Sequence, residues 1–231
     1  MVSKDPALAE LQDRIGHRFK DRELLIRALT HSSFGDGAGD RSNNERLEFL
    51  GDRILGLLTA EKLYETFADV AEGGLAPRLN ALVRRETCAR VALDAGIDKA
   101  LRLSKSEERG GGREKDSILG DACEAMIGAL YLDGGLKAAR HFYDSFWKKE
   151  LKKVIDKPRD PKTALQEWAL AQGYDVPRYT IVGRSGPDHA PKFKVEVSLE
   201  GVKPERGKGS SKQAAERNAA EALFKRETDN G

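Results

Sequence analysis

The nine residues Asn44–Asp52, NERLEFLGD, decide how the first part of the chain folds. Placed on a helix at 100° per residue, Glu45, Glu48 and Asp52 fall within an arc of about 60°. Apolar residues gather on the opposite side: Leu47, Leu50, Ile54 and Leu57. The pattern predicts a long amphipathic helix with one acidic stripe, capped by Asn43 or Asn44 and running toward Ala68.

The acidic stripe has two interpretations. A solvated helix face is the simpler one, and spacing alone does not exclude it. However, Glu48 and Asp52 form a like-charged pair four residues apart, which is unfavourable on an exposed helix. No Lys or Arg lies three or four residues after any of the three acids. The stripe therefore favours a cation supplied from elsewhere.

A second acidic pair lies in a segment that is otherwise built for burial, Ser117–Leu132. Asp121 and Glu124 share one face, while Ala, Cys, Met, Ile and Leu cover most of the rest. Buried carboxylates are costly unless they are paired or bind a metal. A structural ion pair or a cap is one explanation. The other is that they face the first stripe and form an all-oxygen site for Mg²⁺, with Gly120 and Gly128 allowing the helices to approach.

Composition indicates a soluble globular protein. The chain has 231 residues, 39% of them hydrophobic and 34% charged, with a formal net charge of +2. This small charge is weak support for any partner. No apolar run approaches the roughly 18 residues of a membrane span, and the N-terminus lacks a signal-peptide pattern, so we expect a cytoplasmic protein. Its two cysteines are expected to be buried thiols, and its four histidines are scattered.

The hydrophobic period changes near residue 160. Before it, helical spacing predicts helices at 8–15, 24–29, 75–95 and 117–132, with polar loops at 36–41 and 106–116. Beyond it, we expect a helix at 161–172, strands at 179–182 and 193–199, and a last helix at 211–226 after a Gly207–Gly209 turn. Pro204 makes the third strand the weakest prediction. The fold class is thus an all-α N-terminal domain followed by a small α+β (α-β-β-β-α) domain.

Several stretches together resemble the bacterial ribonuclease III family. Besides NERLEFLGD and Asp121–Glu124 (DACE), they include Ala28–Ser33 (ALTHSS), Glu107–Arg113 (EERGGGR) and Ser117–Leu119 (SIL). The C-terminal part resembles a double-stranded-RNA-binding domain in two stretches, Gly186–Phe193 (GPDHAPKF) and Gly207–Lys212 (GKGSSK). The resemblance covers nearly the whole chain.

This resemblance implies a Mg²⁺-dependent endoribonuclease, in which Mn²⁺ can substitute, that cuts double-stranded RNA and leaves 5′-phosphate and 3′-hydroxyl ends. It implies RNA processing, with ribosomal and messenger precursors as substrates, and a homodimer formed through the N-terminal domain. The implied domains are residues 5–151 for catalysis, 152–159 as a linker and 160–228 for RNA binding. A protein of the same fold that binds double-stranded RNA without cutting it is the alternative.

The resemblance also assigns residues. The metal ligands are Glu48, Asp52, Asp121 and Glu124, with Asp52 and Glu124 most directly tied to hydrolysis. Glu45 and Glu72 are supporting acids. For RNA binding, minor-groove and phosphate contacts are expected from Gln166, Glu167, His189, Lys208, Ser211 and Lys212. The chain departs from the family pattern at Arg84, Ser106 and Gln213.

Overall fold

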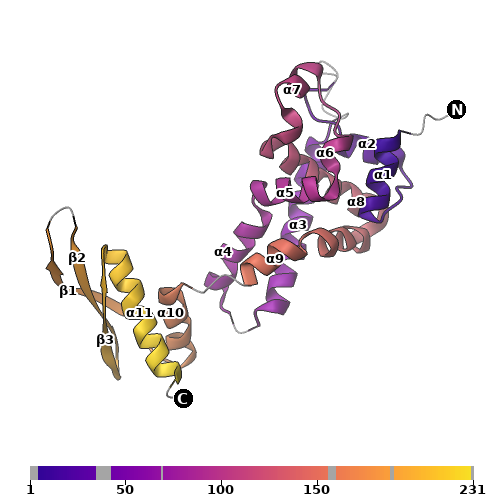
Figure 1. The fold of residues 1–231 in the computed structure, drawn as a ribbon. Helices are drawn as coiled ribbons and strands as arrows, with labels where there is room; N and C mark the ends of the chain where they lie inside the picture. The colour runs from indigo at the N-terminus through magenta and orange to yellow at the C-terminus, as the bar shows by residue number, and fades with distance from the viewer. Residues whose placement is uncertain (1–4, 35–42, 69, 156–159, 188–189, 230–231) are drawn as a thin grey trace. The chain divides into compact units, whose positions relative to one another are not determined.

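The computed structural model describes residues 5–34, 43–68, 70–155, 160–187 and 190–229. The predicted loop at 36–41 lies outside these residues. The chain divides into two compact units, 1–156 and 157–231 (Figure 1). Each unit has its own hydrophobic core. The predicted fold class is confirmed: the first unit is helical and the second combines helices with a three-stranded sheet.

Helices α3 and α8 form the centre of the first unit (Figure 1), with the other helices packed around them. The helices are α1 (Pro6–Ile15), α2 (Arg22–Ala28), α3 (Glu45–Thr66), α4 (Glu72–Val83), α5 (Arg85–Ala95), α6 (Ile97–Ala100), α7 (Lys105–Arg109), the 3₁₀ turn η1 (Gly112–Glu114), α8 (Asp116–Phe146) and α9 (Lys148–Ile155). Within the described ranges, no helix is both long and apolar enough to cross a bilayer.

The long helix α3 begins where the Asn pair predicts. The Asn43 side-chain oxygen accepts a hydrogen bond from the Glu45 amide at 3.2 Å, while Asn44 is buried and makes no side-chain cap bond. Asn43 therefore caps the helix that carries the first acidic stripe.

Helix α8 changes direction at Gly135, whose φ of 70° lies outside the helical region. This break lies just beyond Leu132, where the sequence predicts the helix to end, although a further helical segment continues directly to Phe146. The Asp133 carboxylate accepts hydrogen bonds from His17 Nε2 at 2.8 Å and from the Lys20 and Asp21 amides at 3.1 and 2.9 Å. These bonds fasten the end of the acidic segment of α8 to the turn between α1 and α2.

The predicted helix at 75–95 is wrong as a single element. It is two helices, α4 and α5, joined by extended backbone at Arg84. The break is stabilised by two side chains that donate hydrogen bonds to carbonyl oxygens left free at the end of α4. Thr87 Oγ1 donates to Ala81 O at 2.8 Å, and Trp147 Nε1 donates to Leu82 O at 3.0 Å. The departure from the family pattern at Arg84 thus lies at a helix junction.

One loop prediction also needs correction. Residues 106–116 contain the short helix α7 and η1, because Ser104 Oγ caps α7 by accepting from the Glu107 amide at 3.1 Å. Ser106 lies within α7. Helix α9 continues to Ile155, into the first residues of the expected connection 152–159.

The second unit packs α10 (Pro161–Ala171) and α11 (Lys212–Asp229) on an antiparallel sheet of order β1-β2-β3, as Figure 1 shows. The strands are β1 (Arg178–Ser185), β2 (Lys192–Leu199) and β3 (Val202–Gly209). Pro204 is tolerated because β3 is an edge strand. Gly207–Gly209 belongs to β3 and is not a turn. A Cβ on Gly207 would lie 2.2 Å from Ala219 N, so this glycine lets α11 approach the sheet.

Candidate active site

Helices α3 and α8 cross at a contact between glycines. A Cβ on Gly51 would lie 1.7 Å from the Glu124 carbonyl oxygen, and one on Gly128 would lie 2.3 Å from the Leu47 carbonyl oxygen. Only a residue without a side chain fits at either position. Gly128 has the role predicted for it, whereas Gly120 faces Arg85 of α5 instead. Gly51 was not predicted from the sequence to have this role.

This crossing brings the two acidic helices together. Glu48 and Asp52 lie on α3, and Asp121 and Glu124 lie on α8; all four are part-buried. Burial raises the pKa of Glu124 to about 7, and the charges of Asp52, Glu48 and Asp121 add to the shift. The four carboxylates therefore share one electrostatic environment, as the sequence predicts.

The pKa values of Glu48 and Asp121 are raised as well. Burial is the largest cause for both. For Glu48, the neighbouring charges of Asp121, Glu45 and Asp52 act in the same direction. Repulsion of this kind disfavours the fully ionised state unless positive charge is added.

The donor set is all oxygen, which suits a hard divalent cation. In the side-chain conformations seen, no three Asp, Glu, His or Cys residues of the described ranges are grouped closely enough to hold a metal. The charge and the oxygen donors of the four side chains nevertheless fit a divalent cation, whose positive charge would offset their mutual repulsion.

Two cysteines lie beneath the site. Cys88 and Cys123 are free and fully buried, as expected from the sequence. Cys88 Sγ lies 3.8 Å from Glu124 Oε1 and 3.6 Å from Val83 O. The Cys88 thiol therefore partly opposes the rise in the pKa of Glu124, because its hydrogen bond favours the ionised carboxylate.

Positive charge reaches the site from two residues that the sequence analysis did not assign to it. Arg85 acts to lower the pKa of both Glu48 and Asp121, and His31 acts to lower that of Asp121. His31 is part-buried, and its Nδ1 lies 2.9 Å from Ser33 Oγ. His31 lies in the stretch Ala28–Ser33 that contributes to the family resemblance, whereas Arg85 lies in none of the stretches that carry it.

The supporting acids behave differently. Glu45 is exposed at the start of α3, yet its charge contributes to the raised pKa of Glu48. Glu72 is exposed at the start of α4. Among the interactions of the described residues, none connects Glu72 with the four carboxylates.

The expected RNA-binding residues lie on three elements of the second unit. Gln166 is exposed and Glu167 part-buried on α10. Lys208 is exposed on β3, within the stretch Gly207–Gly209 predicted as a turn. Ser211 Oγ accepts from the Ala214 amide at 3.1 Å, and Lys212 is the exposed first residue of α11. His189 lies outside the described residues.

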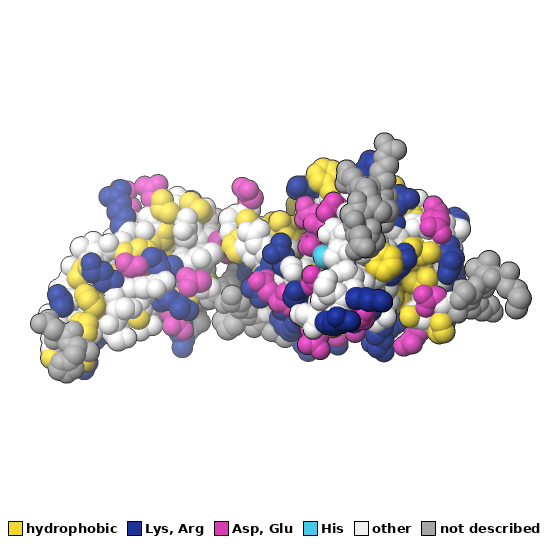
Figure 2. All heavy atoms as spheres, turned by 90° about the horizontal axis from the view of Figure 1, so that it is seen from above, with side chains coloured by type: hydrophobic (Ala, Val, Ile, Leu, Met, Phe, Trp, Pro, Cys, Tyr) yellow, Lys and Arg dark blue, Asp and Glu magenta, His cyan; other side chains and the backbone are white. Residues whose placement is uncertain are grey.

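Acidic and basic side chains are interspersed on the face of each unit drawn in Figure 2. Neither unit presents a continuous surface of one sign there. This agrees with the net charge of +2 and means that recognition of an anion must be local.

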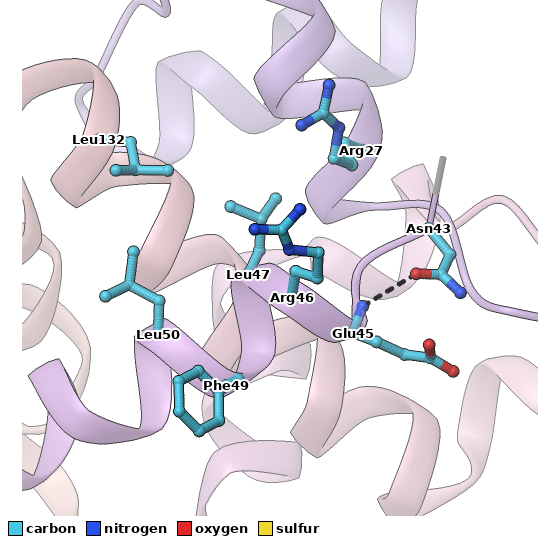
Figure 3. Close-up of a pocket in the computed structure, with 8 residues that line it drawn as sticks. All are labelled: Arg27, Asn43, Glu45, Arg46, Leu47, Phe49, Leu50 and Leu132. Carbon is cyan, nitrogen blue, oxygen red and sulfur yellow. Dashed lines mark hydrogen bonds between the residues drawn. The ribbon is translucent and has the colours of Figure 1, made fainter. Parts of the chain in front are cut away.

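A pocket of about 780 Å³ lies against the start of α3. Its lining is drawn in Figure 3: Arg27, Asn43, Glu45, Arg46, Leu47, Phe49, Leu50 and Leu132. Leu50 of α3 and Leu132 of α8 point toward each other across it (Figure 3). Phe49 beside it is 69% exposed and Leu132 is 55% exposed, so this surface is unusually apolar.

Family models match both units. Residues 21–151 match a ribonuclease-III-like model, and residues 161–226 match a double-stranded RNA binding motif. The chain is 59% identical to Ribonuclease 3 of Caulobacter vibrioides over 222 residues, covering 96% of each chain. It is 53% identical to Ribonuclease 3 of Phenylobacterium zucineum over 230 residues, covering 98% of this chain and 96% of the relative.

Among solved structures, the nuclease domain of ribonuclease III from Campylobacter jejuni is similar to the first unit. It shares 41% identity with a TM-score of 0.59, and the match covers 63% of this chain and 99% of that one. Sequence, domain order and fold therefore agree. The chain belongs to the ribonuclease III family and is an endoribonuclease with a nuclease domain followed by a double-stranded-RNA-binding domain.

Proposed function

We propose that Glu48, Asp52, Asp121 and Glu124 hold Mg²⁺ and hydrolyse phosphodiester bonds of double-stranded RNA. The single observation that carries this proposal is the convergence of four carboxylates from α3 and α8, where burial and then the charges of Asp52, Glu48 and Asp121 raise the pKa of Glu124 to about 7. Members of the family depend on a metal ion, and oxygen ligands favour Mg²⁺, with Mn²⁺ as a substitute. An RNA-binding protein without activity would not need these charges together.

The proposed chemistry follows from the charges. A phosphodiester is an anion, so an attacking water oxygen approaches it poorly. A divalent cation held by the carboxylates would supply positive charge beside the phosphate and lower the pKa of a water molecule. Asp52 and Glu124 would orient the reacting groups most directly, with Glu45 and Glu72 in supporting roles. Breaking the bond to the 3′ oxygen leaves 5′-phosphate and 3′-hydroxyl ends.

The second unit supplies binding to the duplex. Such domains recognise A-form shape through 2′-hydroxyl and phosphate contacts across successive grooves. Gln166 and Glu167 on α10 would contact one minor groove. Lys208 and Lys212 would hold phosphates beside the N-terminus of α11, which Ser211 caps. We propose the same groove-contacting role for His189 as its sequence motif implies.

We also propose the domain boundaries: residues 5–151 for catalysis, 152–159 for the connection and 160–228 for RNA binding. We place the protein in the cytoplasm, where buried free thiols stay reduced and precursor RNA is processed.

The apolar surface around the pocket is proposed as the homodimer interface. Cutting both strands requires two centres, and one chain carries one set of carboxylates. The solved Campylobacter jejuni nuclease domain is described with a region involved in dimer formation. In a two-fold interface the same patch meets itself, so the exposed Phe49 of one copy would enter the pocket of the other. Leu57 and Tyr64 of α3, 57% and 76% exposed, extend the apolar stripe.

The direct test is incubation of a long, perfect RNA duplex with the protein, with and without Mg²⁺. Cleavage is expected only with the metal, and a single-stranded RNA of the same sequence should remain largely intact. End-labelling should find 5′-phosphates. Equal cutting in a chelator, or products ending in a 3′-phosphate, would contradict the proposal.

A further inference from the structure

Arg85, the first residue of α5, packs against the acidic segment of α8. A Cβ on Gly120 would lie 3.0 Å from Arg85 Cγ, 3.3 Å from its carbonyl oxygen and 3.6 Å from its Cα. Gly120 immediately precedes Asp121. The absence of a side chain on Gly120 therefore lets the backbone and the side-chain stem of Arg85 lie directly beside the carboxylate site.

The charge of Arg85 faces carboxylates of both acidic helices. Burial raises the pKa values of Asp121 and Glu48, and Arg85 opposes the shift for each of them. Asp121 is on α8 and Glu48 is on α3, so the charge of Arg85 acts on both acidic helices, while its side-chain stem lies against Gly120 next to Asp121.

This guanidinium is nevertheless not neutralised by a close partner. Within the described ranges, Arg85 forms no ion pair with a carboxylate oxygen at 4.0 Å or less. Its neighbour Arg84 differs, because Arg84 Nε lies 3.7 Å from Glu86 Oε2 on the exposed side of the junction. Arg53 likewise pairs with Asp52 at 3.5 Å. The donor groups of Arg85 remain available to a ligand at the site.

We propose that Arg85 is a further catalytic residue, which binds a non-bridging oxygen of the scissile phosphate. This inference rests on the proposed function of the carboxylate site. A cluster of four carboxylates attracts cations but repels the phosphate itself, so a fixed positive charge at its edge helps the anion to enter. The guanidinium presents forked N–H donors that match phosphate oxygens, and it does not deprotonate.

The same contact would strengthen during the reaction. The oxygen of a water molecule attacks phosphorus, the bond to the 3′ oxygen breaks, and that oxygen takes up a proton. Negative charge on the non-bridging oxygens increases as the transition state is approached. A donor that is already positioned there stabilises the transition state more than the bound substrate. Arg85 exchanges no proton and forms no covalent bond.

The test compares Arg85→Ala with Arg84→Ala in the full-length protein. The measured quantity is the single-turnover cleavage rate of one RNA duplex at saturating protein and a series of Mg²⁺ concentrations. Loss of one transition-state donor predicts a rate roughly 100- to 1,000-fold lower for Arg85→Ala at saturating Mg²⁺. Arg84→Ala should stay within about threefold of the parent, and duplex binding in a gel shift should be unchanged for both variants.

Two further readouts separate phosphate binding from a structural role. Removing a cation beside carboxylates should leave unchanged, or lower, the Mg²⁺ concentration that gives half the maximal rate. Arg85→Lys should recover part of the rate, because it keeps the charge but loses the forked donors. Recovery of the parental rate by Arg85→Ala at high Mg²⁺ would overturn the inference, since the arginine would then only organise the carboxylates.

Failure of this inference can be distinguished from failure of the proposed function. If the parent cuts the duplex with Mg²⁺ and Arg85→Ala cuts equally well, only the role of Arg85 is refuted. If the parent does not cut under any metal condition, the carboxylate site itself is refuted. Because Arg85 is exposed, the variants should unfold at nearly the parental temperature, and a matching thermal melt establishes that they are folded.

Discussion

Replacing Glu124 with Gln should stabilise the metal-free protein at alkaline pH. Burial, with the charges of Asp52, Glu48 and Asp121, raises the pKa of Glu124 from 4.5 to about 7. The unfolded chain therefore ionises Glu124 more readily than the folded chain does. The stability associated with the protonated carboxyl is fully present below about pH 4.5 and is lost as the pH rises through about 7.

The size of the effect follows from the same two values. Each pH unit between 4.5 and about 7 corresponds to 1.36 kcal/mol, which gives an upper limit of about 3.4 kcal/mol. Glu124 is only part-buried, so solvent screening should reduce the difference to about 1–2 kcal/mol. Gln does not ionise and escapes this loss. In a chelator at pH 8, the free energy of unfolding of Glu124→Gln should exceed that of the parent by this amount.

The assay is urea unfolding of both proteins, followed by far-UV circular dichroism at pH 4.5 and pH 8. Glu65→Gln, an exposed change at the other end of α3, serves as the control and should show no comparable pH dependence. Adding Mg²⁺ at pH 8 should stabilise the parent more than Glu124→Gln. If the variant gains nothing at pH 8, or is the less stable protein at both pH values, the shared electrostatic environment proposed for Glu124 is wrong.

Three more predictions concern the architecture. Gly51→Ala should destabilise the protein by about 1–3 kcal/mol, because its Cβ would lie 1.7 Å from a carbonyl oxygen. The control Gly56→Ala, on the same helix, meets nothing within 4 Å and should be neutral or stabilising. Equal denaturation midpoints for the two variants would refute the close helix crossing. Phe49→Asp should convert a dimer to a monomer in analytical ultracentrifugation, and a dimer that persists at low micromolar concentration would remove this surface from the interface. A chain truncated at Asp156 should still cut duplex RNA at low salt but lose activity steeply as salt rises, since fewer phosphate contacts remain. If its salt dependence equals that of the full chain, the second unit does not contribute to RNA binding in the way proposed.

The acidic stripes were predictable from sequence because helical periodicity fixes which residues share a face. Glu45, Glu48 and Asp52 could be placed together in this way, and the apolar surroundings of Asp121 and Glu124 indicated a second buried pair. The meeting of the two stripes depends on tertiary contact, however. Gly51 carries no sign in the sequence that its missing side chain makes room for the backbone of Glu124.

The helix break at Arg84 illustrates a different limit. No Pro or Gly stands at the junction, so local propensity favours one continuous helix across 75–95. The break is stabilised by Thr87 and by Trp147, a residue 65 positions from the carbonyl that it binds. The contribution of Arg85 to the site depends on this break, because α5 presents its first residue to α8 only after the chain has turned.

The most direct test of the metal site is a paired gel-shift and cleavage assay of Glu124→Gln on one RNA duplex. Gln keeps the shape of the side chain but removes the negative charge that a cation requires, and the RNA-binding unit is unaltered. The variant should bind the duplex about as well as the parent and cut it orders of magnitude more slowly at ordinary Mg²⁺, with partial recovery at high Mg²⁺ or Mn²⁺. Near-parental cleavage by the folded variant would remove Glu124 from the site and contradict the metal mechanism proposed for these carboxylates.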